Sequence, residues 1–347
     1  MKNIMPGQGK QLFLLLISTW FATSTPAYSQ PAEQCDATAA EEELQACRAE
    51  LAELQDAPET QPEANLAIAF LSNTGYIDSA QVRSQFRIRY DMDRDIKYPD
   101  RAEFIYGQCN CNPQGVSPGP AENLDIDEVE VSFEYPFTPR LSLFSEIPYR
   151  DVDLRVPALP TVPVTPARTL RSSGIGDIRA GLKYAVIQGT EQYLTFQFRT
   201  YFATGDESEN LGTGHTTIEP ALLYYHRLTS QWTLESEARW WHPTGATRYA
   251  GDVVRLGAGV AHTGWGSSVK ISPVAELVGW YVVDGTKTNG KPIGVEEADG
   301  DTVVNLKLGV RIRLDNHPSS VYLGYGFAIT GQTWYDQVFR LEYRHNM

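Results

Sequence analysis

The chain has 347 residues and a formal net charge of −14 at pH 7, with 43 acidic and 29 basic residues. Hydrophobic residues make up 42%, which excludes wholesale disorder, and a mean hydropathy of −0.32 excludes a bundle of apolar transmembrane helices. The acidic balance argues against a general nucleic-acid binder, and four cysteines are too few for a disulfide scaffold. Glycine (28) and tyrosine (18) are plentiful while long apolar runs are few, so the composition favours a β-rich protein.

Residues 1–29 have the three parts of a signal peptide. Lys2 and Lys10 form a basic start, an apolar run follows from Leu12 to about Ala22, and Ala27 and Ser29 are the small residues before a cleavage site. A transmembrane anchor is the alternative, but the apolar run is too short. The sequence therefore predicts export.

Residues 30–64 are predicted to be a helical segment and its linker. The stretch 33–55 has no Gly or Pro, and Leu44, Cys47, Leu51 and Leu54 repeat at the spacing of a coiled-coil seam. Proline begins the linker, which we expect to run to about residue 80. The helix would lie in the periplasm, where it either joins protomers or is a solvated spacer.

From residue 81 the pattern changes to strict alternation. Val304, Leu306 and Leu308 face one way, for example, while Asn305 and Lys307 face the other. Strands of nine to eleven residues are long enough to cross a bilayer at a tilt. We predict twelve strands, at 81–90, 126–136, 140–150, 176–187, 191–203, 216–228, 231–242, 252–263, 267–283, 302–314, 320–330 and 337–345.

The connections alternate between short turns and longer polar stretches. This segregation is typical of outer-membrane barrels, which have short periplasmic turns and long extracellular loops. Aromatic residues near the strand ends predict the two interfacial girdles: Tyr90, Tyr149, Trp240, Trp241, Trp280, Tyr281, Trp334 and Tyr335 on the outer side, and Tyr135, Phe137, Trp232, Trp265 and Tyr343 on the inner side. The predicted fold is all-β: a twelve-stranded antiparallel transmembrane β-barrel over residues 65–347, with an N-terminal periplasmic helix.

Several segments resemble a known group of barrels. They include 99–104 (PDRAEF), 174–184 (GIGDIRAGLKY), 204–206 with 211–214, 219–220, 324–326 and 340–344 (RLEYR). These resemble an outer-membrane β-barrel family of putative transporters named for the MetA pathway of phenol degradation. The resemblance covers about residues 80–347 and implies a fold, an outer-membrane location and a transport role. Its motifs mark strands and turns rather than chemistry.

The alternation also assigns the lumen wall. Its most informative members are Arg83, Arg87, Arg89, Glu128, Glu130, Glu134, Arg199, Glu235, Glu237, Arg239, Lys307, Arg311, Arg340 and Glu342. Over all the predicted strands, 14 basic and 10 acidic residues face inward, an excess of four positive charges. The arrangement suits a channel, but a salt-bridged plug is a serious alternative because a twelve-stranded bore is small.

Other chemistry has little support. His317 and Ser319 are close in sequence but lie in a predicted turn, and the sequence has no Gly-x-Ser-x-Gly elbow. Asp206, Glu207 and Glu209 are better explained as part of a solvated loop than as a Ca²⁺ site. Cys35 and Cys47 are too far apart along one intact helix to bond to each other, and Cys109 and Cys111 are too closely spaced for an easy mutual bridge. Interchain disulfides or free thiols are the remaining alternatives for all four. We therefore expect no enzyme activity, no metal site and no cofactor.

The sequence thus predicts a channel or transporter for small solutes, possible substrates being aromatic or other hydrophobic compounds, in the cell outer membrane of a Gram-negative-type bacterium. The alternatives are a structural or adhesive barrel with a plugged lumen and, less favoured, a lipid-active enzyme. The expected partners are outer-membrane lipid, a small-molecule solute, the barrel-assembly machinery through Tyr343, and a second copy of the chain through the helix. No nucleic acid is expected.

Deleting residues 30–64 should leave a folded barrel, because the predicted strands all follow this segment. The truncated protein should still migrate faster on a gel before boiling than after it, as folded barrels do. A truncated chain that cannot be refolded in detergent would place this segment within the barrel core.

Overall fold

The computed structural model describes residues 72–96, 123–158, 166–244, 251–288, 295–315, 317–330 and 335–347. The predicted signal peptide, the predicted helix, all four cysteines and Trp334 lie outside these residues, so those expectations remain predictions. Among the described residues, no helix is long and apolar enough to cross a membrane. The one helical turn in this part of the chain is a 3-10 turn at Glu207–Glu209.

Alternating sequences form long strands, as the period of two predicts. The strands are β1 (Gln85–Ile96), β2 (Asn123–Thr138), β3 (Leu141–Val156), β4 (Arg168–Ile175), β5 (Arg179–Gln188), β6 (Gln192–Tyr201), β7 (Thr216–Arg227), β8 (Trp232–Thr244), β9 (Val253–His262), β10 (Val269–Val282), β11 (Thr286–Thr288), β12 (Val295–Glu297), β13 (Thr302–Leu314), β14 (Ser319–Ala328) and β15 (Gln337–Asn346). β11 and β12 form a separate hairpin within one long loop.

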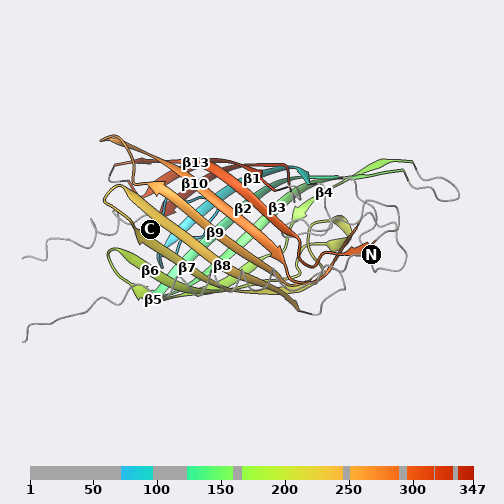
Figure 1. Ribbon diagram of the computed structural model, residues 1–347, viewed down its shortest axis with the longest axis horizontal. Coiled ribbons are helices and arrows are strands. Elements are labelled where there is room, and N and C mark those ends of the chain that lie inside the picture. Colours follow the sequence, from blue (N-terminus) through green and yellow to red (C-terminus); the bar gives the residue numbers. More distant parts are fainter. Residues whose placement is uncertain are drawn as a thin grey trace, which may run out of the picture. The chain divides into compact units, whose positions relative to one another are not determined.

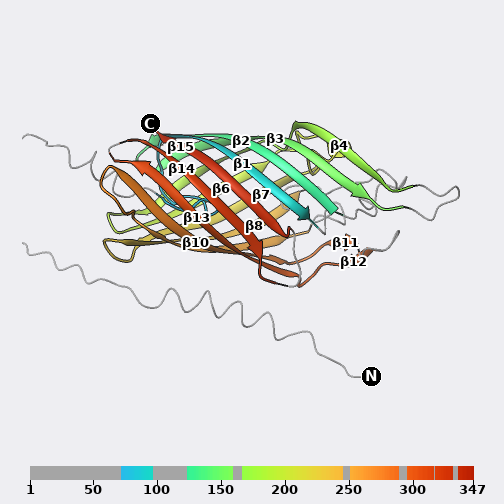
Figure 2. The same cartoon turned by 90° about the horizontal axis from the view of Figure 1, so that it is seen from above.

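The other strands close into an antiparallel barrel. Neighbours in the sheet follow the chain, β1 pairs with β15, and the pairing of β2 with β3 completes the ring. β4 and β5 together occupy one place, because β3 pairs with β5 through Leu141–Glu146 and with β4 through Tyr149–Val156. The predicted twelve-stranded antiparallel barrel is therefore confirmed. Figures 1 and 2 show the tilted strands around the lumen, with the β3–β4 hairpin projecting beyond one end.

The predicted strand at 176–187 needs a correction, because residues 176–178 belong to no strand: β4 ends at Ile175 and β5 begins at Arg179. The Asp177 side chain is buried there and accepts hydrogen bonds from the backbone N–H groups of Gly205 (3.0 Å) and Thr213 (2.8 Å). The carboxylate thus ties the break to the loop after β6. We call the end of the barrel with the short turns the turn end, and the other the loop end.

The two faces of the wall differ as predicted. Ile88, Leu277 and Leu323 point outward and are exposed, whereas Glu130, Glu276 and other residues of the opposite parity are buried inside. At the turn end, the five predicted girdle residues are all at least 40% exposed, so their outward position is confirmed.

The prediction of an aromatic girdle at the loop end was partly wrong. Tyr149 and Trp240 are exposed, but Trp241, Trp280 and Tyr335 are buried. Trp241 has the parity of Arg239, which faces the lumen. With Leu124, Leu154 and other inward apolar residues, these aromatics form a hydrophobic layer inside the loop end.

The outward face makes a depth-dependent stability prediction on β13. Leu308, in mid-strand, and Leu314, at the turn end, are both exposed (47% and 55%). Leu308→Lys should lower the free energy of unfolding by about 2–4 kcal/mol, whereas Leu314→Lys should lower it by roughly 0–1 kcal/mol, because a charge costs most at the bilayer midplane. Denaturant unfolding in lipid vesicles measures both. Equal costs would contradict a membrane-facing β13.

Candidate functional site

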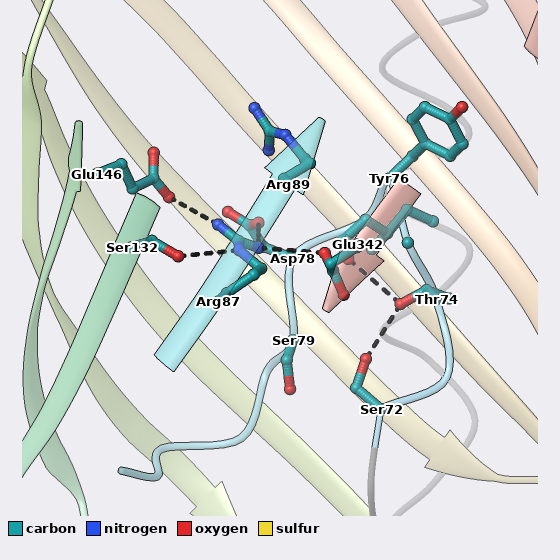
Figure 3. A network of polar contacts seen from close by, with 12 residues as sticks. Ser72, Thr74, Tyr76, Asp78, Ser79, Arg87, Arg89, Ser132, Glu146 and Glu342 are labelled. Atoms are coloured by element: carbon teal, nitrogen blue, oxygen red, sulfur yellow. Dashed lines mark hydrogen bonds and ion pairs between the residues drawn. The ribbon is translucent and has the colours of Figure 1, made fainter. Parts of the chain in front are cut away.

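A segment before the first strand lies inside the barrel. Residues 72–81, which we call the plug segment, are not a strand, and all of them except the half-buried Asp78 are buried. Figure 3 shows this stretch running past the inward side chains of the wall. The linker that we expected to lead to the first strand therefore fills the lumen instead. No periodicity marks this segment, so sequence reasoning missed it.

Wall carboxylates hold the backbone N–H groups of the plug segment. The most complete site is Glu276 on β10, whose two carboxylate oxygens accept three such hydrogen bonds at 2.8–2.9 Å, from Gly75, Tyr76 and Ile77. On β8, Glu235 accepts from the Asn73 N–H (3.1 Å) and Glu237 from the Asp78 N–H (3.2 Å). Glu276 is thus satisfied largely by peptide groups, whereas Glu237 also pairs with Arg239 (2.7 Å) and Arg255 (2.8 Å).

Wall cations hold the carbonyl groups of the same segment. The Arg311 guanidinium donates to the carbonyls of Asn73 (3.0 Å) and Thr74 (2.7 Å). Further bonds run from Arg340 to Gly75 (2.6 Å), from Arg255 to Tyr76 (2.8 Å), from Lys183 to Ser79 (3.2 Å) and from Arg344 to Ser72 (3.3 Å). The wall therefore recognises the path of the backbone more than the side chains it carries.

Asp78 is the acidic side chain of the plug segment. Its carboxylate lies 2.5 Å from Arg199, 2.7 Å from Arg239 and 3.8 Å from Arg87. Sequence analysis found a surplus of lumen cations but not this carboxylate, which offsets part of it. Removing one partner from such a buried cluster typically costs about 3–5 kcal/mol.

The remaining wall charges pair with one another. Arg87 contacts Glu130 at 3.2 Å. It also contacts Glu146 at 3.2 Å and Ser132 at 3.0 Å (Figure 3). The closing seam carries another group, in which Glu342 lies 2.9 Å from Arg311 and from Arg344. Charged side chains of β1, β2, β3, β13 and β15 thus satisfy each other.

The structure brings most of the predicted lumen residues into these networks. Arg89 joins Glu128 and Glu130, Arg199 and Arg239 share Glu219, and Arg239 also pairs with Glu237. Lys183 pairs with Glu134, and Arg340 pairs with Asp91. Arg83 lies beside Gln81 and Asn346, and Lys307 lies over the Tyr76 ring. Arg150 on β3, which was not among the predicted lumen residues, is fully buried against Glu128.

Little space is left around the plug segment on one side of the lumen. A cavity of about 20 Å³ lies between Asp78, Arg87, Glu146 and Arg199. A volume of this size holds about one water molecule. The plug segment and the wall therefore leave room for about one water molecule at this place.

The loop between β6 and β7 folds against the inside of the loop end. Leu211 is buried in the hydrophobic layer, and its carbonyl accepts a hydrogen bond from Arg150 (3.0 Å). His215 is buried too; burial lowers the pKa of its imidazole, whose Nδ1–H donates to the Thr213 carbonyl (3.0 Å). Asp206, Glu207 and Glu209 are exposed, and the described residues contain no cluster fit for a metal ion.

A serine and a histidine meet on the outward face at the turn end. The Ser319 hydroxyl lies 2.8 Å from Nδ1 of His345 and 2.9 Å from the Tyr343 hydroxyl. Nucleophilic catalysis also needs a group that orients the histidine. Within the part of the chain that the structure describes, no carboxylate contacts His345, so this pair does not form a triad.

Comparisons with known proteins support the fold. No protein-family model and no curated protein matches the chain. Among solved structures, an outer-membrane channel from Pseudomonas putida F1 is similar with a TM-score of 0.50 at 13% identity, covering 80% of this chain and 100% of that one. The P. putida toluene transporter TodX (TM-score 0.42, 12% identity) and a Pseudomonas aeruginosa FadL homologue (0.38, 12%) each cover 81% of this chain and 92% of their own. The family resemblance itself stays an expectation.

Gly75 provides a test of how the plug segment is seated. A Cβ atom built on Gly75 would lie 2.2 Å from the Tyr322 ring, so Gly75→Val should displace the segment. With the four cysteines replaced by serine, a Ser79→Cys variant reports the displacement through a thiol reagent. Gly75→Val should raise its labelling rate about tenfold or more, because overpacking costs roughly 1–3 kcal/mol.

Gly189→Val is the matched control, since a Cβ atom there meets nothing closer than 3.5 Å. It should leave the labelling of Ser79→Cys unchanged. Equally slow labelling in Gly75→Val would show that the segment is not seated against Tyr322.

Proposed function

We propose that this chain is an outer-membrane channel for small solutes and that the plug segment closes it. The observation that carries the proposal is the construction of the lumen: a closed barrel with a charged inner wall is filled by a segment that belongs to no strand. The alternative is a permanently sealed structural barrel.

The membrane location rests on the outward surface. In a closed barrel every strand is paired on both sides, so no sheet edge is left unsatisfied in lipid. Exposed apolar side chains cover the outside, and aromatic residues such as Tyr135 and Trp265 stand at the turn end. We assign the barrel to the outer membrane of a Gram-negative-type bacterium, with lipid as its surroundings.

The proposal that the plug can leave rests on the nature of its bonds. Its backbone is held by carboxylates and guanidiniums, and water can replace each of these hydrogen bonds. A permanently sealed interior would generally be at least as stable with apolar packing, because buried ion pairs repay their desolvation poorly. A charged wall suits a lumen that water fills in another state.

The solute class follows from the lining of the open lumen. Asp78 would leave the lumen with the plug segment, which increases the positive surplus of the wall. The hydrophobic layer at the loop end, with Leu124, Leu154 and Trp280, offers contact to an apolar group. Small solutes that combine an apolar part with a negative charge fit both features, and aromatic compounds are among them.

Two further partners remain proposals from sequence. The segment predicted to be helical, 30–64, is proposed to join protomers on the periplasmic side. Tyr343, an exposed residue of the last strand, is proposed to be read by the barrel-assembly machinery during insertion.

Removing residues 72–81 should open the channel. The deletion variant should show larger single-channel conductance in a planar bilayer than the full chain, and its reversal potential in a salt gradient should indicate anion preference, because the lumen then keeps its excess of cations. Faster migration of the unboiled sample on a gel confirms that the variant is folded.

A disulfide provides the matched control. In a cysteine-free background, Ala80→Cys with Thr195→Cys would tie the plug segment to β6, where the Thr195 hydroxyl donates to the Ala80 carbonyl. The oxidised protein should stay closed, and reduction should restore the conductance of the parent. A folded deletion variant that conducts no better than the full chain would favour the sealed barrel.

A further inference from the structure

The barrel wall builds a site for an aromatic ring, and Tyr76 of the plug segment fills it. The Lys307 ammonium lies 3.9 Å from the centre of the Tyr76 ring, and the Arg340 guanidinium lies 4.0 Å from it. Tyr322 on β14 packs edge-on against the same ring, with centroids 6.2 Å apart at 82°. Two cations and one aromatic edge, from three different strands, thus converge on one ring.

The site extends beyond Tyr76. The same Lys307 ammonium lies 5.4 Å from the centres of the Trp280 and Tyr335 rings, which meet each other edge-on. A cation is attracted to the face of an aromatic ring, most strongly where both are shielded from water. The wall therefore keeps aromatic surface around Lys307 even when Tyr76 is absent.

The wall also recognises the carbonyl groups beside the ring. Arg255 donates to the Tyr76 carbonyl (2.8 Å), and Arg340 donates to the Gly75 carbonyl (2.6 Å). In a tyrosine residue, two carbon atoms separate the ring from the carbonyl carbon. The wall thus binds an aromatic ring and an oxygen acceptor whose carbon lies two carbon atoms from that ring, and Tyr76 supplies both.

Tyr76 matches the site incompletely. Its hydroxyl is buried and has no hydrogen-bond partner among the described residues. Asn305, two positions before Lys307 on β13 and equally inward, is fully buried with both amide atoms unpartnered there. A buried polar group without a partner has given up its hydrogen bonds to water and gained none in return. A free ligand that carries its own polar groups can form hydrogen bonds with Asn305 that the Tyr76 ring does not form.

We propose that Tyr76 is a tethered substitute for a free ligand and that the site binds 3-arylpropanoates, which carry a carboxylate two carbons from an aromatic ring. The inference rests on the proposed function, since it names the ligand that competes with the plug segment. The ring takes the place of Tyr76 over Lys307 and Arg340. The carboxylate takes the place of the peptide carbonyls.

A carboxylate is the stronger partner for these groups. Displacing the plug segment removes the carbonyl partners of Arg255 and Arg340, while Arg255 stays paired with Glu237 and Arg340 with Asp91. In place of a neutral carbonyl, the ligand brings a full negative charge and two acceptor oxygens to these guanidiniums. A ligand that binds the unplugged state alone shifts the closed state toward the open one by mass action. At about 100 times its dissociation constant it raises the ratio of open to closed about 100-fold.

The experiment uses the full chain and 3-(4-hydroxyphenyl)propanoate as the probe. The Ser79→Cys variant in the cysteine-free background reports displacement of the plug segment through its labelling rate. The probe should raise this rate tenfold or more and should also raise the conductance in a planar bilayer. 3-Cyclohexylpropanoate, with the same charge and spacer but no aromatic face, should do neither; an equal effect of the two compounds would overturn the proposal.

Two variants make the test specific to the site. Lys307→Met should abolish the response to the probe, while Tyr325→Leu, a change on the outward face, should leave it intact. A persistent response in Lys307→Met would overturn the assignment.

The two proposals fail in different ways. If deletion of residues 72–81 opens the channel but the probe changes neither labelling nor conductance, the ligand site is wrong and the channel stands. If the folded deletion variant does not conduct, the channel is wrong, and the labelling assay still decides whether the probe displaces Tyr76.

Discussion

The cost of burying charge controls the construction of this protein. Every second residue of a strand must face the lumen, and in the middle of the barrel many of these residues are acidic or basic. In a space of low polarity each charge needs a partner, because an isolated buried ion costs several kcal/mol. Arg87, between Glu130 and Glu146, shows one solution, in which the side chains of neighbouring strands neutralise each other.

The plug segment is the second solution. Glu276 accepts three hydrogen bonds from successive peptide N–H groups, and Arg311 donates to two successive carbonyls on the same stretch of chain. Glu276 and Arg311 lie on the neighbouring strands β10 and β13, and Lys183 on β5 holds the Ser79 carbonyl. One short segment therefore satisfies acids and bases from several strands of the wall. Because the backbone makes these bonds, only a few positions of the segment require a particular residue type. Gly75 is needed because a larger residue would not fit, Tyr76 supplies a ring, and Asp78 supplies a negative charge.

Alternation of side chains predicts the barrel well, because each strand must turn one face toward the lipid and the opposite face toward the lumen. The strand at 302–314 was located to the residue, and the loop pattern gave the topology. The errors in the outer girdle have a common cause. Trp241 and Trp280 were placed in the outer girdle from their position near strand ends, although their parity places them inside.

The long-range contacts of the plug segment could not be predicted from the sequence, because the segment has no periodic pattern. The partner of the Asn73 N–H is Glu235, 162 residues away, and a backbone donor leaves no trace in the sequence. Asp78 alone gave a signal, as one acid shortly before a strand with three arginines. The surplus of inward cations, read together with that acid, could have suggested that the chain folds back into its own barrel.

The charges that hold the plug segment also make its departure possible. An apolar plug on an apolar wall would expose hydrophobic surface to water whenever it left, at a cost that grows with the area uncovered. Here the uncovered groups are carboxylates, guanidiniums and peptide groups, which water solvates well. Opening exchanges one set of hydrogen bonds for another, so the free-energy difference between the two states can be small compared with the number of bonds broken. A ligand then needs only a few favourable contacts to change the balance, and the ring site at Lys307 offers contacts of this kind.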